Sequence, residues 1–521
     1  MFDNISPKTR VWAFSAIVSL SSSLFGGDTG SIGAITAMPQ FIEHFGELSE
    51  FLRGFVVAVI LIPSAITGMF AGSVADRIGR RRTVSVGTLI FAAGMAMCVA
   101  APNLIVFIVG RCVAGSGEGL FLSAGTVYLC EISPKALRGR IMTMYQMFLT
   151  AALALGFFVC YGTIRVQSSL AWRLPIIISA SVAFLTGIAS LLILPYSPRW
   201  LVSQGRKAEA EAVLSLITSG DEEERKELLQ LPPRGDKAGW IDIFRKGVRG
   251  RTLLGAFLNI FQQLSGIDFV LFYAPLLFAQ AGLDPKTSAF VASGVTGVVL
   301  FVMSAISATY VDRAGRRTLF LRGGLGIAVC HTLIGALYAS GAAYSPGGKW
   351  AIIVLIELFA ILFSGTWAIV VRIYSTEIQP SRTRSAASSF CIGVNQLVNT
   401  LVALTSPAFL AKSPYGPYFL YGGLSAFATA VAYLYMQETM GKSLESIDTS
   451  FHESPTAVNW PPSLLLNSAR RTQAEATRRP SRGSNSRPNE NGRPSFSNRY
   501  KMERLGSDMG PEGLQGSAIE E

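Results

Sequence analysis

Seven ionisable residues lie inside long apolar segments, where charged groups are costly and are usually retained for function. They are Asp28, Arg111, Glu118, Asp268, His331, Glu357 and Arg372. A carboxyl group in a low-dielectric cavity favours its protonated form, whereas a nearby guanidinium favours the charged form. A buried carboxyl group beside an arginine therefore predicts a group that binds and releases a proton. The alternative is a static buried ion pair. We expect His331 to be a packed helix residue, and the sequence does not decide the role of Glu357.

A charged motif occurs twice, once in each half of the chain. Asp76-Arg77-Ile78-Gly79-Arg80-Arg81 recurs as Asp312-Arg313-Ala314-Gly315-Arg316-Arg317, and Glu131-x-x-Pro134-x-x-x-Arg138 recurs as Glu377-x-x-Pro380-x-x-x-Arg384. We expect these acids and arginines to pair in one conformation only, forming a latch whose opening shifts a conformational equilibrium. The alternative is that the charges only set the membrane topology, but acids contribute little to orientation. The predicted latch residues are Asp76, Arg77, Arg81, Glu131, Arg138, Asp312, Arg313, Arg317, Glu377 and Arg384.

The composition is that of an integral membrane protein. Half of the 521 residues are hydrophobic, only 15% are charged, and the mean hydropathy is +0.41. Soluble proteins carry nearer a quarter of charged residues. Twelve apolar runs are each long enough to cross the hydrocarbon core of a bilayer. They lie near 11–38, 54–75, 83–101, 103–130, 140–163, 172–195, 252–280, 288–311, 318–340, 350–376, 385–411 and 416–437.

The runs and the repeat predict five parts. We expect a cytoplasmic N-terminus (1–10), an N-terminal six-helix bundle (11–195), a cytoplasmic linker with amphipathic helices (196–251), a C-terminal six-helix bundle (252–437) and a disordered basic cytoplasmic tail (438–521). The linker helices are expected at 206–217 and 221–229. Internal repeats of this kind place a substrate site at the interface between the halves.

The distribution of Lys and Arg predicts the orientation. Cations concentrate in the loops at 77–82, 135–140, 313–317 and 382–384, whereas the opposite loops carry one or two. Both termini are therefore expected in the cytoplasm. The formal net charge of +12 follows from these loops and the basic tail, so no nucleic-acid partner is expected.

Further motifs follow in order between Trp12 and Asp448. They are Phe25-Gly26-x-Asp28, Gly110-Arg111, Ser197-Pro198-Arg199-Trp200-Leu201, Gln262-Gln263-x-x-Gly266-Ile267, Tyr273-Ala274-Pro275 and Glu438-Thr439-x-Gly441-Lys442-Ser443-Leu444-Glu445. Together with the two charged repeats, they resemble the sugar porter family of the major facilitator superfamily, in particular fungal-type sugar/proton symporters. The resemblance implies an all-α integral membrane fold with twelve transmembrane helices in two six-helix bundles, which rock about a central site to give alternating access.

The resemblance also implies roles for particular residues. Asp28 matches the titrating carboxylate of proton-coupled members, and Arg111 matches its cationic neighbour. Glu118 lies seven residues after Arg111 and therefore on the same helix face, at a position where the family is usually apolar. It either shares the arginine or serves as a second proton carrier. The expected solute site offers paired amides for hydroxyl groups and aromatic walls, with the candidates Phe25, Gln262, Gln263, Asp268, Tyr273, Arg372, Asn395 and Asn399.

Four positions depart from the family pattern. Gly27 replaces a common Tyr, Leu153 replaces a Gln, Asp268 replaces an Asn, and Arg372 replaces the Trp on which sugars stack. The departures predict an Asp268–Arg372 pair at the site. Either Arg372 binds an anionic or strongly polar group directly, or Asp268 holds the guanidinium as a gate.

The leading hypothesis is a proton-coupled transporter of a sugar-like or polyol-like small solute. The alternatives are a facilitator or exporter of a more polar or acidic metabolite, and a nutrient sensor that signals through its tail. No catalytic constellation is evident, so we expect neither an enzyme nor a cofactor or metal; the proton gradient is the expected energy source. The expected partners are the solute, protons and the lipid bilayer, with a regulatory kinase or turnover machinery acting on the tail. The plasma membrane is the expected location.

Overall fold

The computed structural model describes residues 6–134, 137–217, 229, 240–280, 288–442 and 444–453. Within these ranges the secondary structure is helical, without a strand. The linker helix predicted at 221–229 falls almost entirely outside the described residues, as does the predicted tail after residue 453. The described start of that tail is ordered and ends in a helix, Leu444–Glu453, so the prediction of disorder from residue 438 is wrong there.

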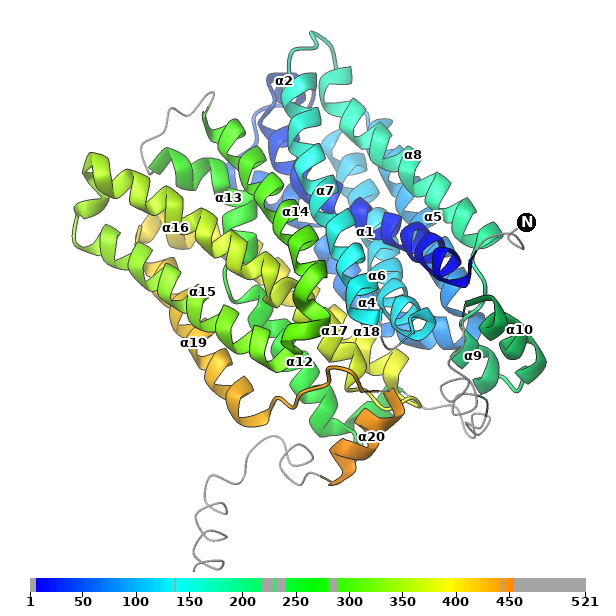
Figure 1. Ribbon diagram of the computed structural model, residues 1–521. Helices are drawn as coiled ribbons and strands as arrows, with labels where there is room; N and C mark the ends of the chain where they lie inside the picture. The colour runs from blue at the N-terminus through cyan, green and yellow to red at the C-terminus, as the bar shows by residue number, and fades with distance from the viewer. Residues whose placement is uncertain are drawn as a thin grey trace, which may run out of the picture. The chain divides into compact units, whose positions relative to one another are not determined.

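The first half of the chain forms one bundle of six membrane-spanning segments, in which α3 and α4 together make up one segment (Figure 1). Its helices are α1 (Pro7–Ala37), α3 (Glu50–Ala58), α4 (Leu61–Ile78), α5 (Arg80–Val99), α6 (Leu104–Ile132), α7 (Arg138–Thr163) and α8 (Leu170–Ile193), with the short α2 (Pro39–Phe45) after α1. Local chemistry sets several helix starts: Ser6 caps α1 just before Pro7, and Asn103 accepts a hydrogen bond from the backbone N–H of Val106 in α6. Both arrangements satisfy donors that a helix leaves free at its first turn.

The second half repeats this arrangement. Its helices are α12 (Arg249–Gln263), α13 (Ile267–Gln280), α14 (Ser288–Ala314), α15 (Arg316–Ala339), α16 (Pro346–Gly365), α17 (Trp367–Glu377), α18 (Arg384–Lys412) and α19 (Gly416–Tyr435). Shorter elements complete the described chain: α9 (Pro198–Ser203), α10 (Lys207–Ile217), η1 (Trp240–Phe244), η2 (Ala342–Tyr344) and α20 (Leu444–Glu453). The linker helix predicted at 206–217 coincides with α10.

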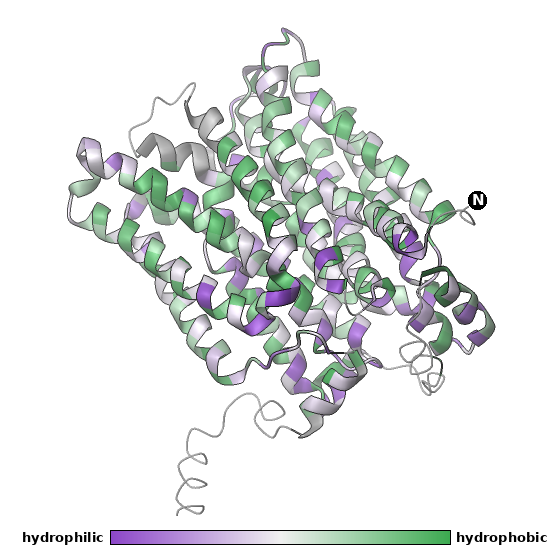
Figure 2. Cartoon of the chain, in the orientation of Figure 1, coloured by the Kyte–Doolittle hydropathy of each residue, from purple (hydrophilic) through white to green (hydrophobic). Residues whose placement is uncertain are grey.

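The predicted membrane spans agree with these helices. In the described residues, ten helical segments are long and apolar enough to cross a membrane, and each coincides with a predicted span. The two remaining predicted spans are occupied by α1 and α19, which are 31 and 20 residues long. Figure 2 shows hydrophobic residues along the long helices and hydrophilic ones gathered around α10 and α20. The predicted fold class is confirmed.

Three of the spans are discontinuous. A turn separates α3 from α4, Gly266 with a φ of +83° lies between α12 and α13, and Thr366 separates α16 from α17. A broken helix frees backbone groups that need partners inside a membrane, and such breaks often mark the binding site of a transporter. Side chains supply those partners here. Arg111 donates to the carbonyl of Val57 at 2.9 Å, and the buried His331 lies 2.8 Å from the carbonyl of Ser265.

Small residues allow the helices of a bundle to approach closely. A Cβ atom on Gly115 of α6 would lie 2.0 Å from the carbonyl oxygen of Ile60, and one on Gly119 would lie 2.2 Å from that of Ser64. Neither position accepts a side chain without moving α4. The run Gly115-x-Gly117-x-Gly119 therefore serves helix packing in the membrane.

The two bundles meet where α4 packs against α18 and α7 packs against α14. A Cβ on Gly72 of α4 would lie 2.3 Å from the carbonyl oxygen of Ser385 in α18, and Ser385 donates a hydrogen bond back to Gly72 at 3.1 Å. The linker also contacts both bundles. Trp240 of η1 donates to the carbonyl of Met69 at 3.1 Å and packs against the ring of Phe390.

Candidate transport site

A cavity of about 60 Å³ lies between the two bundles. It is bounded by α1 and α7 from the first bundle and by the two helix breaks of the second. The wall residues are Phe25, Thr29, Gln146, Leu149, Leu153, Gln262, Gln263, Ile267, Asp268, Leu271, Phe363, Ala368 and Arg372. Five predicted solute-binding residues therefore share this wall, contributed by elements far apart in the sequence.

The amides predicted to bind solute hydroxyls form a connected group. Gln263 donates to Asn395 Oδ1 at 2.9 Å, and Asn395 donates to Gln262 Oε1 at 3.1 Å. Gln262 in turn donates to the carbonyl of Trp367 at 3.0 Å, which joins the break between α12 and α13 to the break between α16 and α17. Asn395 lies behind the wall and orients the two glutamines that face the cavity.

Two other predicted ligands lie outside the cavity wall. Tyr273 donates its hydroxyl to the carbonyl of Ala403 at 2.7 Å. Asn399 is fully buried, and neither its Oδ1 nor its Nδ2 atom has a hydrogen-bond partner. Buried amides normally form hydrogen bonds. In this conformation the side-chain amide of Asn399 retains a donor and an acceptor without a partner among the described residues.

Asp268 and Arg372 reach the same cavity without forming an ion pair within 4.0 Å. Asp268 lies two residues after the break at Gly266, and its Oδ2 atom is buried without a hydrogen-bond partner. The guanidinium of Arg372 lies over the ring of Tyr145, 5.7 Å from its centroid. The predicted pair is thus placed at the site but is not closed in this conformation.

The sequence analysis missed two polar wall residues, Thr29 and Gln146. Thr29 follows Asp28 directly in α1. Gln146 precedes Leu153 by seven residues, or two helical turns of α7, and its Oε1 atom is buried without a hydrogen-bond partner. The signal was available, since a lone amide two turns from a predicted wall position lies on the same helix face.

The predicted proton site is a buried ion pair between α1 and α6. Arg111 Nη1 lies 2.7 Å from Asp28 Oδ1, and the two residues are only 1% and 8% exposed. The other terminal nitrogen of Arg111 binds the Val57 carbonyl at the α3–α4 break, which fixes the guanidinium. Arg111 therefore links Asp28 of α1 to the break between α3 and α4.

Glu118 does not form an ion pair with Arg111 in the described structure, so the arginine is not shared in that way. It is fully buried and accepts a hydrogen bond from Gln396 of α18 at 3.1 Å. The two other intramembrane groups are also packed. Glu357 accepts from Thr296 at 2.6 Å, and the ring of His331 lies 4.4 Å from that of Phe359.

The first copy of the charged motif binds helices of its own bundle together. Arg80, the first residue of α5, lies 3.0 Å from Asp76 and 3.1 Å from Glu131. Glu131 also accepts a hydrogen bond from the Ser197 hydroxyl at 2.5 Å. These contacts join the ends of α4, α5 and α6 to the segment that begins the linker.

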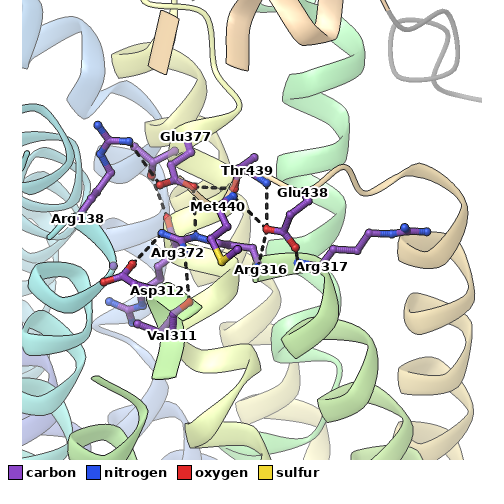
Figure 3. A network of polar contacts seen from close by, with 12 residues as sticks. Arg138, Val311, Asp312, Arg316, Arg317, Arg372, Glu377, Glu438, Thr439 and Met440 are labelled. Atoms are coloured by element: carbon purple, nitrogen blue, oxygen red, sulfur yellow. Dashed lines mark hydrogen bonds and ion pairs between the residues drawn. The ribbon is translucent and has the colours of Figure 1, made fainter. Parts of the chain in front are cut away.

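The second copy repeats these contacts and adds others (Figure 3). Arg316, the first residue of α15, lies 3.1 Å from Asp312 and 3.6 Å from Glu377, and the Thr439 hydroxyl donates to Glu377 at 2.8 Å. Arg138 of the first bundle lies 3.6 Å from the other oxygen of Glu377. Arg138, which closes the first copy of the motif, and Glu377 of the second copy therefore connect the two bundles.

Asp312 and Glu438 complete this network through backbone groups. Asp312 accepts from the backbone N–H of Arg140 in α7 at 3.1 Å, a second contact between the bundles. Glu438 accepts from the first two backbone N–H groups of α15, those of Arg316 and Arg317, at 2.8 and 3.1 Å. A carboxylate at a helix N-terminus satisfies free donors and favours the helix dipole.

The structure selects different arginines from those predicted for the latch. Arg81 donates to the backbone carbonyl of Leu194 at 2.7 Å. The guanidinium of Arg317 donates to the backbone carbonyl of Tyr433, also at 2.7 Å. Arg77 and Arg313 are exposed. Arg80 and Arg316 bind the acids instead. Each lies four residues after its aspartate, directly after a glycine that ends the preceding helix at φ +89° or +81°. Arg138 is in the network as predicted, and Arg384 is buried nearby, 3.5 Å from the Ser381 hydroxyl.

Two six-helix bundles around a central cavity, with broken helices at the cavity and a charged network at one face, define a multi-pass membrane transporter of the major facilitator superfamily. The chain belongs to the sugar (and other) transporter family, whose model matches residues 14–451. The family is one of transporters rather than enzymes.

The chain is similar to several known members. It is 31% identical to the probable metabolite transport protein CsbC of Bacillus subtilis, over 85% of this chain and 95% of that protein. It is 29% identical to the sugar transport protein MST3 of Oryza sativa, over 83% of this chain and 89% of that protein. Among solved structures, the proton:xylose symporter XylE of E. coli bound to 6-bromo-6-deoxy-D-glucose matches with a TM-score of 0.74 at 24% identity, over 85% of this chain and 99% of that one.

Proposed function

We propose that this protein carries a sugar-like or polyol-like small solute across a membrane by alternating access, together with a proton. The observation that carries the proposal is the position of the Asp28–Arg111 pair. Phe25 and Thr29, one turn before and one residue after Asp28, both line the solute cavity. The proton site and the solute site therefore share one helix, α1, and a change at either site is felt at the other.

The proposed cycle follows from this shared helix. A proton taken up by Asp28 neutralises the carboxylate and releases Arg111, which frees α1 to move against α6. Solute bound by Gln262 and Gln263 links α1 to the second bundle across the cavity, so the bundles rock with the solute enclosed. When the opposite side opens, the proton leaves and the ion pair forms again.

We further propose an orientation and a location. The face that carries the loops 76–82 and 312–317, here called the charged face, lies in the cytoplasm, because positively charged loops are retained there. Both termini then lie in the cytoplasm, and the plasma membrane is the proposed location. We also propose that a kinase or the turnover machinery acts on the basic tail.

Replacing Asp28 by Asn tests the proton coupling. We expect D28N in proteoliposomes to lose solute accumulation driven by a pH gradient, while exchange of internal for external solute continues, since the amide cannot carry a proton. The matched control is E209Q, an acid-to-amide change in the exposed Arg206–Glu209 pair of the linker. If D28N accumulated solute as well as the native protein does, Asp28 would not be the coupling group.

One observation favours a second candidate, a transporter of an acidic metabolite. The guanidinium of Arg372 faces the cavity where an indole is expected, and arginine binds carboxylates in a planar, two-pronged manner. A thermal-shift panel of hexoses, pentoses, polyols and sugar acids separates the two candidates, because only a ligand that binds the native state stabilises it. Stabilisation by sugar acids alone, lost in R372Q, would establish the second candidate; stabilisation by neutral sugars or polyols that persists in R372Q supports the first.

A further inference from the structure

We propose that Glu118 is a second proton-carrying group, which receives the proton that Asp28 gives up when it pairs with Arg111. This inference rests on the proposed proton coupling and extends it toward the charged face. It is carried by the position of Glu118 along α6, by its hydrogen bonds and by the bundle from which those bonds come.

Glu118 stands between the proton site and the latch. It follows Arg111 by seven residues and precedes Glu131 by thirteen, so it lies about 10 Å along the helix from the Asp28–Arg111 pair and about 20 Å from the latch acid. A proton released from Asp28 toward the charged face passes the level of Glu118. Among the described acids of α6, it is the one placed to accept a proton on this route.

The surroundings of Glu118 are unusual for a structural carboxylate. Its Oε1 atom accepts from Gln396 Nε2 at 3.1 Å, the Ser64 hydroxyl lies beside the carboxyl group, and its buried Oε2 atom has no hydrogen-bond partner within the geometric limits among the described residues. No Lys, Arg or His nitrogen of the described residues lies within 4.0 Å of it. Buried acids that serve only structure are normally paired or fully hydrogen-bonded, whereas an acid that alternates between two protonation states cannot have fixed partners for both oxygens in both states.

Groups from five helices contact Glu118 or act on it electrostatically. The charged or titratable ones are Asp28 of α1, Arg111 of α6 itself and Tyr145 of α7. The neutral ones are Ser64 of α4 and Gln396 of α18, which also hydrogen-bond to each other at 3.2 Å. Asp28 is therefore the neighbouring acid with which Glu118 can exchange a proton.

The contact with Gln396 connects the protonation state of Glu118 to the motion of the bundles. Gln396 belongs to the second bundle, and its amide donates a hydrogen bond to Glu118. This hydrogen bond is stronger when Glu118 is a carboxylate than when it is a neutral acid. In the proposed step, the proton of Asp28 passes through intervening water molecules to the Glu118 carboxylate, leaving the Asp28 carboxylate paired with Arg111. The neutral Glu118 then holds α18 less tightly, the bundles separate at the charged face, and Glu118 releases the proton to water.

The test uses the full-length protein in proteoliposomes. E118Q keeps an acceptor oxygen for Gln396 but cannot carry a proton, whereas E118D keeps the carboxyl group. For E118Q we expect solute exchange to continue and the melting temperature to fall slightly, because the amide accepts a weaker hydrogen bond from Gln396, together with loss of both pH-gradient-driven accumulation and solute-coupled proton uptake. For E118D we expect coupling to be at least partly retained.

The outcomes separate this inference from the proposed function. Full coupling in E118Q would overturn the inference, and equal loss of coupling in E118Q and E118D, with exchange intact, would make Glu118 a positioning residue instead. If E118Q lost exchange as well, coupled proton uptake by E118D would support the inference and its absence would overturn it. Native protein that shows no proton dependence would instead contradict the proposed function itself.

Discussion

The two copies of the charged motif have their acids and arginines at matching positions, but those acids bind different parts of the molecule. Each consists of an aspartate, an arginine four residues later, a glutamate at the end of a helix and a hydroxyl that donates to that glutamate. These residues are Asp76, Arg80, Glu131 and Ser197 in the first bundle, and Asp312, Arg316, Glu377 and Thr439 in the second.

The second copy also receives Arg138 and the backbone N–H of Arg140 from the first bundle. Its acids therefore hold the two bundles together at the charged face, whereas Glu131 binds Arg80 and Ser197 of its own half. The difference shows that a duplicated sequence can supply both an internal brace and a gate. It also predicts that equivalent substitutions in the two copies have unequal effects.

The largest difference is expected between E377Q and E131Q. E377Q removes the charge that faces Arg138 and Arg316, and loss of one partner of a buried pair costs on the order of 3 kcal/mol. That cost falls on the conformation closed at the charged face, so we expect E377Q to open this face. E131Q should mainly lower the melting temperature of the first bundle.

Spin labels at the exposed positions 77 and 313, in a chain whose native cysteines are replaced, measure this opening as a distance between the bundles. A longer mean distance in E377Q than in E131Q would agree with the two roles. Equal distances in the two variants would show that both copies act alike.

An intermediate effect is expected for the two glycines. Gly79 and Gly315 both have positive φ, so alanine is strained at either position by about 1 kcal/mol or more. A Cβ on Gly315 would also lie 2.5 Å from the carboxylate of Glu438, which caps α15, whereas one on Gly79 would meet the ring of Tyr196 at 2.9 Å. We expect G315A to lower the melting temperature more than G79A; the opposite order would show that the cap at Glu438 contributes little.

The smallest effect is expected for the two hydroxyls. S197A and T439V each remove one hydrogen bond to a buried glutamate, worth about 1–2 kcal/mol because the acceptor is charged. S197A should lower only the thermal stability, and by more than T439V, because the Ser197 hydroxyl also caps α9 by accepting from the backbone N–H of Trp200. T439V should also lengthen the distance between the labels slightly, because Glu377 bridges the bundles. An unchanged label distance in T439V would place Thr439 outside the gate.

The fold was predictable because a membrane imposes simple rules. Each span needs about twenty apolar residues, and the predicted runs coincide with the described helices. The helix breaks were not predicted. Gly266 gave a local signal, and so did Pro63, which cannot donate a hydrogen bond to the carbonyl of Val59 in the turn between α3 and α4. The sequence did not show that Arg111 binds the freed carbonyl of Val57.

The site was predictable in part. Residue types identified Asp28, Arg111 and the glutamines, because polar groups in apolar helices are few. They did not show that Asn395 lies behind the wall or that Arg80, rather than Arg77 or Arg81, binds the acids. Those outcomes depend on the direction in which a side chain leaves its helix, which for Arg80 follows from the turn at Gly79.

The hydrogen bond from Gln262 to the Trp367 carbonyl has a mechanical consequence. It ties the two kinks of the second half together, so bending at one kink strains the bond at the other. In the proposed cycle, enclosure of cargo by this half is then favoured as a concerted movement of two hinges, by about the 1 kcal/mol that one such bond contributes.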